Sequence, residues 1–412
     1  MKILIITQYF WPESFRINDL SLELKERGHK VSVLTGMPNY PSGTIFEGYG
    51  WSTIGRSDYE GIPLFRVPLF GRREGRSWQL ALNYISFAIA ASILGPFMCQ
   101  DKYDIIFVYE PSPFTVGIPA VLLRWLKKIP MIFWVQDLWP ESVNAAGGVS
   151  STSLIAMIGK LVRWIYKRCD KVLAQSRGFF EPAKAAGAPR NRIEYFPNWA
   201  ESIYMPIILN AKAPERMKFP EGFNVLFAGN LGTAQSLETL VSAAEKLKNE
   251  ADIQWLILGD GRQEGWLRDK ISELGLEKTL HLLGRFPVEK MPRYFSLADV
   301  LLVTLRRDLI FARTIPSKVQ SYLACGKPII GAIDGEGAKV INESGAGFAV
   351  PAEDSDALAA KVLELYRLPS ERLEEMGEQG MIYYKTNFDR DKLVNRLEKI
   401  MAKVKEGGLC ES

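Results

Sequence analysis

The sequence has little of what several enzyme classes require. Only two of its 412 residues are histidines, His29 and His281, so a histidine-based zinc site or a Ser-His-Asp triad has almost nothing to draw on. The four cysteines show no metal-ligand spacing, and we expect them to be reduced and mainly structural in a cytosolic compartment. No low-complexity tract or internal repeat is present, which argues against a repeat architecture.

A signal peptide is not expected either. The opening apolar run, residues 3–6, has four residues and is followed by Thr7 and Gln8, which indicates a buried first strand. Excess charge is also limited: the net charge is +4, divided into +7 for residues 1–200 and −3 for residues 201–412. The basic first half suits an anionic membrane face. The excess is small and no nucleic-acid motif accompanies it, so we do not expect a nucleic-acid partner.

What the chain does have is a regular alternation of short apolar strands and amphipathic helices. Continuous apolar runs are typical of parallel strands covered on both faces. Two successive series, separated by a proline-containing linker at 197–222, predict an α/β chain with two Rossmann-like domains that face a central cleft. We place the domains at 1–200 and 201–385, with a C-terminal helix in 386–412 that packs back onto the first. The expected strands are 2–7, 31–35, 104–109, 131–135, 171–175 and 193–196, then 223–228, 253–258, 280–283, 299–303 and 328–331.

Two glycine-containing loops directly follow strands of the second series. Residues 229–232 (GNLG) follow strand 223–228, and residues 259–261 (GDG) follow strand 253–258. Glycines let backbone amides approach an anion, and a following helix N-terminus adds positive potential. The alternative is an ordinary tight turn between strand and helix, and for the first loop we weigh the two equally. The second loop is weak evidence by itself, since it does not match the GxGxxG pattern of a dinucleotide site.

A third phosphate-type feature is the segment 314–318 (TIPSK), which opens an expected helix over 317–325. Ser317 is expected to be the N-cap of this helix, and Lys318 to lie in its first turn. A cation at this position opposes the helix dipole, so a bound anion would make Lys318 favourable. The alternative is a solvated basic loop, because Arg306, Arg307 and Arg313 lie just before it.

Carboxylates follow strand 131–135 in the segment 136–141 (QDLWPE). Asp137 and Glu141 flank Trp139, a set that suits hydrogen bonding to sugar hydroxyls and stacking on a sugar face. The same residues are also common at a helix N-terminus, and we weigh the two interpretations equally. Residues 354–356 (DSD) match a metal-binding DxD pattern, but they directly precede a helical run, so N-capping explains them better and no metal site is expected.

Two segments of the first half are candidates for membrane contact. Residues 77–100 carry no charge, but polar residues, glycine and proline break the apolar run. The segment is a poor membrane-spanning helix and a fair interfacial or buried one, and we favour a crossover helix of the first domain. Residues 154–168 are amphipathic, with four cations beside Trp164 and Tyr166. Such a basic, aromatic helix can lie on an anionic bilayer, and this interpretation and that of a crossover helix are equally strong.

Together these motifs resemble the retaining, metal-independent GT-B glycosyltransferases of family 4, over essentially the whole chain. The opening, MKILIITQYFWPESFRINDLSLELKERGHKVSVLTGMPNYP, resembles the bacterial subgroup of WbuB-like L-fucosamine transferases and colanic-acid enzymes. The order and spacing of that subgroup also hold for QDLWPES, FAGNLGTAQSLETL, LGDG, LGRFP and TIPSKVQSYLACGKPII.

The resemblance implies a UDP-sugar donor in the second domain and a polyprenyl-diphosphate-linked glycan acceptor against the first, with no metal or other cofactor. It implies a peripheral position on the cytoplasmic membrane and a role in surface polysaccharide synthesis. The sugar would be an N-acetylated deoxyhexosamine such as N-acetyl-L-fucosamine. The leaving diphosphate would assist the acceptor hydroxyl, and the enzyme would stabilise the charge that grows on it.

The same resemblance carries roles to individual residues. Asp137 and Lys318 would be catalytic, and Trp139 and Glu141 would lie on the acceptor side. The donor-binding residues would be Gly229, Asn230, Gly232, Gln235, Gly259, Gly261, Arg285, Arg313, Pro316, Ser317 and Gln320.

The sequence departs from the broad family at the donor site. Where the family has two glutamates eight positions apart, this chain has Arg313 and Ser321, and Asn230 and Gln235 replace a usual Arg and Lys. The subgroup shares this pattern, which favours altered donor choice. One alternative is a non-catalytic, membrane-associated partner on a degenerate transferase fold. Another is a nicotinamide enzyme acting on nucleotide sugars, which the missing glycine fingerprint disfavours.

Overall fold

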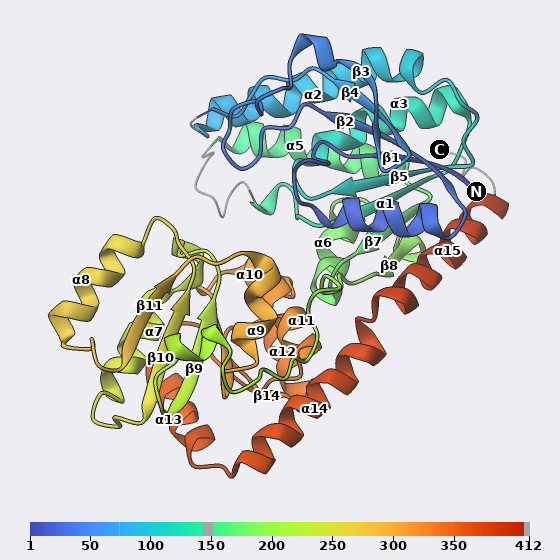
Figure 1. The fold of residues 1–412 in the computed structure, drawn as a ribbon. Coiled ribbons are helices and arrows are strands. Elements are labelled where there is room, and N and C mark those ends of the chain that lie inside the picture. Colours follow the sequence, from blue (N-terminus) through green and yellow to red (C-terminus); the bar gives the residue numbers. More distant parts are fainter. Residues whose placement is uncertain (74, 143–150, 408–412) are drawn as a thin grey trace. The chain divides into compact units, whose positions relative to one another are not determined.

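The computed structural model describes residues 1–73, 75–142 and 151–407 (Figure 1). The chain forms two compact units, one of Met1–Pro197 with Asp391–Ser412 and one of Asn198–Arg390. These boundaries lie within a few residues of the expected 200 and 385. Each unit is a sheet covered by helices on both faces, the Rossmann-like organisation that the alternating pattern predicts.

The first unit contains an eight-stranded sheet in the order β3-β4-β2-β1-β5-β6-β7-β8. Every neighbouring pair is parallel except β3 and β4, which form an antiparallel hairpin at one edge. The chain order reverses between β1 and β5, so the crevice outside their carboxyl ends is the expected ligand position. The strands are β1 (Lys2–Ile6), β2 (Lys30–Gly36), β3 (Gly55–Tyr59), β4 (Ile62–Val67), β5 (Ile105–Glu110), β6 (Met131–Val135), β7 (Lys171–Ala174) and β8 (Ile193–Tyr195).

One core layer joins this sheet to four helices. Alternate residues of β1, Leu4 and Ile6, share a buried cluster with Phe87, Leu123 and Ile165 from three of those helices. The helices of the first unit are α1 (Arg16–Glu26), α2 (Ser77–Met98), α3 (Gly117–Lys127), α5 (Thr152–Lys167), α6 (Phe180–Ala185) and the C-terminal α15 (Arg390–Glu406). Of these, α2, α3, α5 and α6 line the cluster, and α1 lies on the other face of the sheet (Figure 1).

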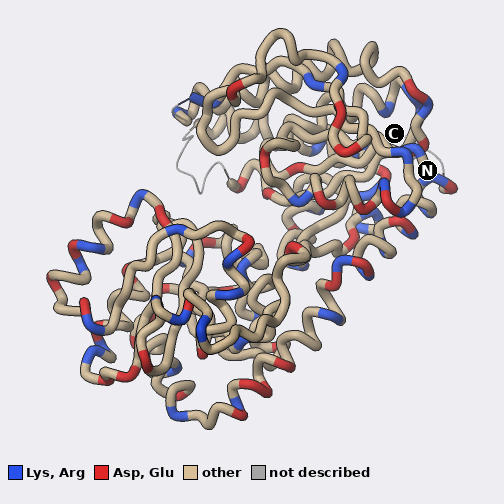
Figure 2. The backbone as a smooth tube through the Cα atoms, in the orientation of Figure 1, with Lys and Arg blue, Asp and Glu red and all other residues tan. Residues whose placement is uncertain are grey.

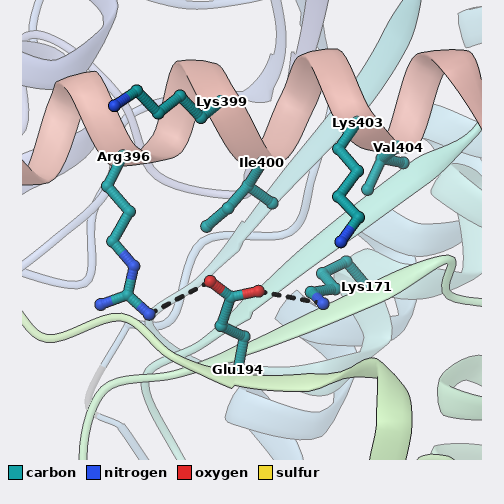
Figure 3. A pocket seen from close by; sticks show the side chains of 7 residues that line it. All are labelled: Lys171, Glu194, Arg396, Lys399, Ile400, Lys403 and Val404. Carbon is teal, nitrogen blue, oxygen red and sulfur yellow. Dashed lines mark hydrogen bonds and ion pairs between the residues drawn. The ribbon is translucent and has the colours of Figure 1, made fainter.

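Helix α15 returns the end of the chain to the first unit. Glu194 on the edge strand β8 accepts an ion pair from Lys171 at 2.9 Å and one from Arg396 of α15 at 3.1 Å (Figure 3). These contacts, together with Ile400, line a hollow of about 210 Å³ that is otherwise basic through Lys399 and Lys403. The hollow lies at the sheet edge, away from the β1/β5 crevice.

The second unit contains six parallel strands in the order β11-β10-β9-β12-β13-β14. This is the doubly wound order in which the chain reverses direction between its first and fourth strands, here β9 and β12. A ligand crevice is therefore expected at their carboxyl ends. The strands are β9 (Phe223–Ala228), β10 (Ile253–Leu258), β11 (Leu280–Gly284), β12 (Val300–Thr304), β13 (Ile329–Ala332) and β14 (Gly347–Val350). The helices are α7 (Leu237–Lys246), α8 (Glu264–Leu274), α9 (Met291–Phe295), α10 (Leu309–Arg313), α11 (Ser317–Ala324), α12 (Gly335–Ser344), α13 (Ser355–Tyr366) and α14 (Ser370–Asn387).

The segment 77–100 is the expected crossover helix, and it is buried on one side only. The segment forms α2, which crosses from β4 to β5 as expected, and its inner side is buried through Phe87 and Ala91. Its outer side exposes large apolar residues along its whole length, such as Ile89 and Phe97. Among the described residues α2 is also the single helix long and apolar enough to cross a membrane, on length and composition alone.

Candidate functional site

The two glycine loops of the second unit lie against each other at the carboxyl ends of β9 and β10. The Gly229 N–H donates to the Leu258 carbonyl at 2.8 Å, and the Leu231 N–H donates to the Asp260 carbonyl at 2.7 Å. Gly261 has a φ of +157°, and a Cβ there would stand 2.5 Å from the Leu231 carbonyl oxygen. Only glycine therefore permits this contact between the loops.

This arrangement corrects one detail of the expected phosphate site. The Gly229 amide is already engaged within the protein, so it is not free to bind an anion. The Gly232 amide is the better candidate, because it has no acceptor among the residues that the structure describes. The Asn230 side chain lies close to Gly232, since its Nδ2 would stand 2.9 Å from a Cβ placed on that glycine. Gly259 packs beneath Gly229, where a Cβ would stand 1.8 Å from the Gly229 carbonyl oxygen.

Lys318 reaches this loop from the first turn of α11. Its Nζ donates to Gln235 Oε1 at 2.5 Å and lies 3.9 Å from the centre of the Phe227 ring. A Cβ on Gly229 would meet the Lys318 Nζ at 2.6 Å, so the glycine makes room for the amine. Within the described parts of the chain Lys318 forms no ion pair, and burial lowers the pKa of its ammonium to about 7. An amine held without a counter-charge at a ligand crevice is a candidate site for an anion.

The structure assigns the N-cap of α11 to Pro316, with Ser317 as the first helical residue. The expected N-cap role of Ser317 is therefore wrong, and no side chain caps this helix. The missing cap leaves the first-turn amides of the helix without a side-chain acceptor, next to Lys318. An anion bound there would satisfy both the amides and the ammonium.

The other predicted donor residues lie at different distances from this centre. Arg285 is on the same edge of the sheet but largely exposed, with an ion pair to Asp260 at 3.3 Å. Arg313 ends α10 and is half-buried. Gln320 is directed elsewhere: it is buried and its Nε2 donates to the Asn198 carbonyl at 2.8 Å. The structure thus gives Gln320 a contact with the start of the unit, and its donor role stays a prediction.

In the first unit, Asp137 lies at the carboxyl ends of β5 and β6 beside a second carboxyl group. The Ser142 hydroxyl donates to Asp137 Oδ1 at 2.6 Å, and the Asp137 N–H donates to Glu110 Oε2 at 3.4 Å. Glu110 is 1% exposed, and its Oε1 has no hydrogen-bond partner among the described residues. Burial, and secondly the charge of Asp137, raise the pKa of Glu110 well above its ordinary value. Burial also raises the pKa of Asp137. The surroundings of Glu110 therefore favour the neutral form of its carboxyl group.

A polar cluster that the sequence reasoning missed surrounds Asp137. The Tyr84 hydroxyl is within hydrogen-bonding reach of Ser112 and Tyr9. The charge of Asp137 raises the pKa of this hydroxyl and the charge of Arg72 lowers it. These residues come from α2 and from the ends of β1, β4 and β5, so only the sheet order brings them together. The polar residues that follow strands 2–7 and 104–109 were a usable signal, because both strands border the switch point.

A chain of buried amides connects this cluster to α2. Gln8 Nε2 donates to Asn83 Oδ1 at 2.7 Å, and Asn83 Nδ2 donates to the Phe70 carbonyl at 2.6 Å and to Asn39 Oδ1 at 3.3 Å. Buried amides are expensive unless they are hydrogen-bonded, so this chain fixes the helix against the loops that line the crevice.

Glu13 holds two of those loops. It accepts the N–H groups of Asn39 and Tyr40, each at 2.7 Å, and that of Phe10 at 3.2 Å. Burial raises the pKa of its carboxyl to about 7 despite these bonds and the nearby Arg66.

The two residues predicted to lie on the acceptor side, Trp139 and Glu141, are found in different places. Trp139 packs into an aromatic group, with its ring centre 5.1 Å from that of Phe114 and 6.3 Å from that of Tyr84. Glu141 faces a different hollow of about 380 Å³, lined by Lys160 and Arg163 of the α5 side. The structure thus places Trp139 beside the Asp137 cluster and Glu141 outside it, and their acceptor roles stay predictions.

Two Rossmann-like units, each a largely parallel sheet with helices on both faces, are the organisation of the GT-B fold, which this chain shares with solved glycosyltransferases. Residues 14–199 match the glycosyl transferase 4-like domain, and residues 211–382 match the glycosyl transferases group 1 family. The chain is therefore a glycosyl transferase 4-like domain followed by a glycosyl transferases group 1 domain.

Relatives of known name are similar across most of the chain. A protein named as the colanic acid biosynthesis glycosyl transferase WcaI of Escherichia coli K12 is 25% identical over 79% of this chain and 82% of its own. A protein named as the glycosyltransferase WbjE of Pseudomonas aeruginosa is 28% identical over 60% of this chain and 62% of its own. HepE of Anabaena, solved with UDP and glucose, shares the fold with a TM-score of 0.67 at 16% identity, covering 98% of this chain and 99% of that one.

Proposed function

We propose that the chain transfers a sugar from a UDP donor to a lipid-linked glycan acceptor in bacterial surface-polysaccharide synthesis. The observation that carries the proposal is Lys318, an amine without a counter-charge beside the β9 loop. Relatives that are named as colanic acid and amylovoran biosynthesis glycosyltransferases support the assignment to polysaccharide synthesis. The fold neighbours solved with UDP or a UDP-sugar analogue support the donor.

The reaction we propose retains the configuration of the anomeric carbon and uses no metal ion. The bond between that carbon and the β-phosphate oxygen breaks, and the acceptor oxygen forms its bond to the same face of the sugar. The proton of the acceptor hydroxyl passes to the leaving phosphate oxygen. Charge therefore grows on the diphosphate, and a preorganised cation is the group that stabilises it. Lys318, the Gly232 amide and the uncapped end of α11 supply that stabilisation.

On the acceptor side we assign the positioning of the acceptor hydroxyl to Asp137. Ser142 and the Leu138 N–H bond to its carboxylate, which fixes the orientation of its oxygens. The acceptor we propose is a glycan on a polyprenyl diphosphate at the cytoplasmic face of the membrane. For the donor sugar we propose an N-acetylated deoxyhexosamine such as N-acetyl-L-fucosamine, on the resemblance to L-fucosamine transferases.

The first test is isothermal titration of the purified protein with UDP and with GDP, each with and without EDTA. We expect UDP to bind, GDP to bind at least tenfold more weakly, and EDTA to change neither. The bound nucleotide then directs a screen of UDP-sugars for turnover. Lys318→Ala should lose far more turnover than acceptor affinity, and Lys327→Ala is the control, since Lys327 precedes β13 at the opposite end of the sheet.

The second candidate is a non-catalytic, membrane-associated partner on a degenerate transferase fold. Arg313 and Ser321, which stand where the broad family has glutamates, are the observation that favours it. This candidate predicts no turnover with any donor. If neither nucleotide binds, it replaces the transferase proposal, and the donor-site assignments fall with it.

A further inference from the structure

The outer side of α2 is an apolar surface that no element covers within the described ranges 1–73, 75–142 and 151–407. Its large apolar residues follow one another at helical spacings of three and four, so they form a single stripe. They are between 37% and 71% exposed: Trp78, Leu82, Ile85, Ile89, Ile93 and Phe97. A helix that is apolar on both sides needs an apolar neighbour on each. On the inner side of α2, Phe87 and Ala91 pack into the core cluster with the sheet, which is the first neighbour. The neighbour on the outer side is still to be assigned.

The adjoining helices extend this surface. Helix α3 packs along α2 and exposes Trp125, at 72%, and Leu126 beside it. Helix α5, which shares the same core layer, exposes Met157 and Trp164. Tryptophans at the rim of an apolar area are typical of the boundary between hydrocarbon and water in membranes.

Taken together, the three helices of this face carry basic residues and no acidic ones. Helices α2, α3 and α5 contain no Asp or Glu, whereas α1 on the other side of the sheet carries Asp19, Glu23 and Glu26 (Figure 2). Cations lie before the start of α2, on α3 next to it and on α5 beyond α3: Arg73, Arg76, Lys127, Lys128, Lys160, Arg163, Lys167 and Arg168. Arg124 of α3 is instead paired with Asp170 at 3.0 Å. Basic residues around an apolar, tryptophan-bearing surface complement an anionic bilayer.

We propose that this face, the outer side of α2 with Trp125 and the basic residues of α3 and α5, lies in the interface of an anionic lipid bilayer with α2 parallel to the membrane plane. A spanning position is inconsistent with the inner side of the helix. Asn83 is buried there and bonded to Gln8, Asn39 and the Phe70 carbonyl. A symmetric contact with a second copy would bring the same cations together with no carboxylate on these helices to pair them.

The position of α2 in the membrane interface also bears on how the acceptor reaches the site. This step of the argument rests on the proposed function. Tyr84, between the exposed Leu82 and Ile85 in sequence, turns inward to the Asp137 cluster. The same two turns of α2 therefore touch the bilayer on one side and the acceptor crevice on the other. A lipid-linked acceptor would reach the crevice without leaving the membrane.

The test is co-sedimentation with vesicles of phosphatidylcholine alone and of phosphatidylcholine mixed with phosphatidylglycerol. We expect the full chain to bind the mixed vesicles, and Ile89→Glu to lower the partition coefficient about tenfold or more. Ile382→Glu on α14 is the matched control, because Ile382 is also a helical isoleucine at 54% exposure. Thermal unfolding and UDP titration check that each variant is folded.

Two results would overturn the proposal. One is wild-type binding of the mixed vesicles that Ile89→Glu leaves unchanged. The other is a wild-type protein that ignores vesicles but forms a dimer which Ile89→Glu dissolves, which would assign the face to a second copy. The proposed function fails separately: if UDP does not bind while Ile89→Glu still abolishes vesicle binding, the membrane face stands without the transferase.

Discussion

Lys318 makes UDP affinity depend on pH in a direction that the structure fixes. Burial without a counter-charge lowers the pKa of its ammonium to about 7 in the free protein. A diphosphate beside it favours the charged form and raises the pKa toward the ordinary value. The protein must then take up a proton when UDP binds above pH 7. Affinity therefore falls as the pH rises through and above 7.

The size of the effect follows from the two pKa values. If the bound diphosphate restores the ordinary pKa of 10.5, the dissociation constant rises about 50-fold between pH 7 and pH 9, or about 2.3 kcal/mol. Near pH 8, about 0.9 proton should be taken up per UDP bound. The range starts at pH 7 because the terminal phosphate of the nucleotide titrates near pH 6.

The assay is isothermal titration at several pH values between 7 and 9, each in two buffers of different ionisation enthalpy, which reports proton uptake directly. Lys318→Arg should flatten the profile, since a guanidinium stays charged throughout. Gln235→Glu should also flatten it and weaken UDP, because the new carboxylate pairs with the ammonium and repels the diphosphate. Lys327→Met should keep the wild-type slope, although burial lowers the pKa of Lys327 too.

A wild-type affinity that is constant from pH 7 to pH 9, with no proton uptake, would refute the reasoning. So would a Lys327→Met variant that loses the slope, because the titrating amine would then lie outside the β9 loop.

Four further changes have defined outcomes. Glu110→Gln should unfold at nearly the wild-type temperature near pH 4.5 and become relatively more stable as the pH rises above it, since a carboxyl pKa raised above the ordinary 4.5 costs the wild type stability in that direction. Asp137→Asn should lower kcat about 100-fold or more and change UDP affinity less than twofold, as kinetics and titration would measure. Gly261→Ala, with its Cβ 2.5 Å from the Leu231 carbonyl oxygen, should cost about 1–3 kcal/mol in urea unfolding and weaken UDP. Lys318→Met should raise the free energy of unfolding by about 1–3 kcal/mol at pH 7 while UDP binding is lost, because it removes a buried charge.

The strands that the sequence predicts well are those of the parallel sheet interiors. Runs such as FNVLFA and IQWLIL are buried on both faces, and the observed β9 and β10 have the predicted bounds. Three strands were missed: β3 and β14 lie at sheet edges, and β4 lies one strand in from the edge, next to β3. Strand β3, GRSDY, is mostly exposed and pairs on one side only, so its composition gives no apolar signal. Its antiparallel hairpin with β4 depends on a turn with positive φ at Glu60 and Gly61.

The donor site was more accessible to sequence reasoning than the acceptor site. Gly229, Gln235 and Lys318 lie in loops that each directly follow a strand or open a helix, a local pattern that can be read along the chain. The acceptor cluster is assembled from Tyr9, Arg72, Tyr84, Ser112 and Asp137, which no local pattern connects. Only the pairing of β1 with β5, across about one hundred residues of sequence, brings them together. Which amide of the β9 loop is free depends likewise on the Asp260 carbonyl, a contact between two loops.

The structure shows what Ser321 does at the position where the broad family has a glutamate. Its hydroxyl donates to the Ser317 carbonyl at 3.2 Å, and the side chain is 7% exposed, so this position has no free group for a ligand. Lys318, one turn earlier, is thus left without a carboxylate to neutralise it, and Gln235 is its only described polar partner. A degenerate fold would gain stability by replacing such an amine with an apolar side chain. An ammonium that lowers stability without a ligand and is satisfied by a diphosphate favours a working donor site over a vestigial one.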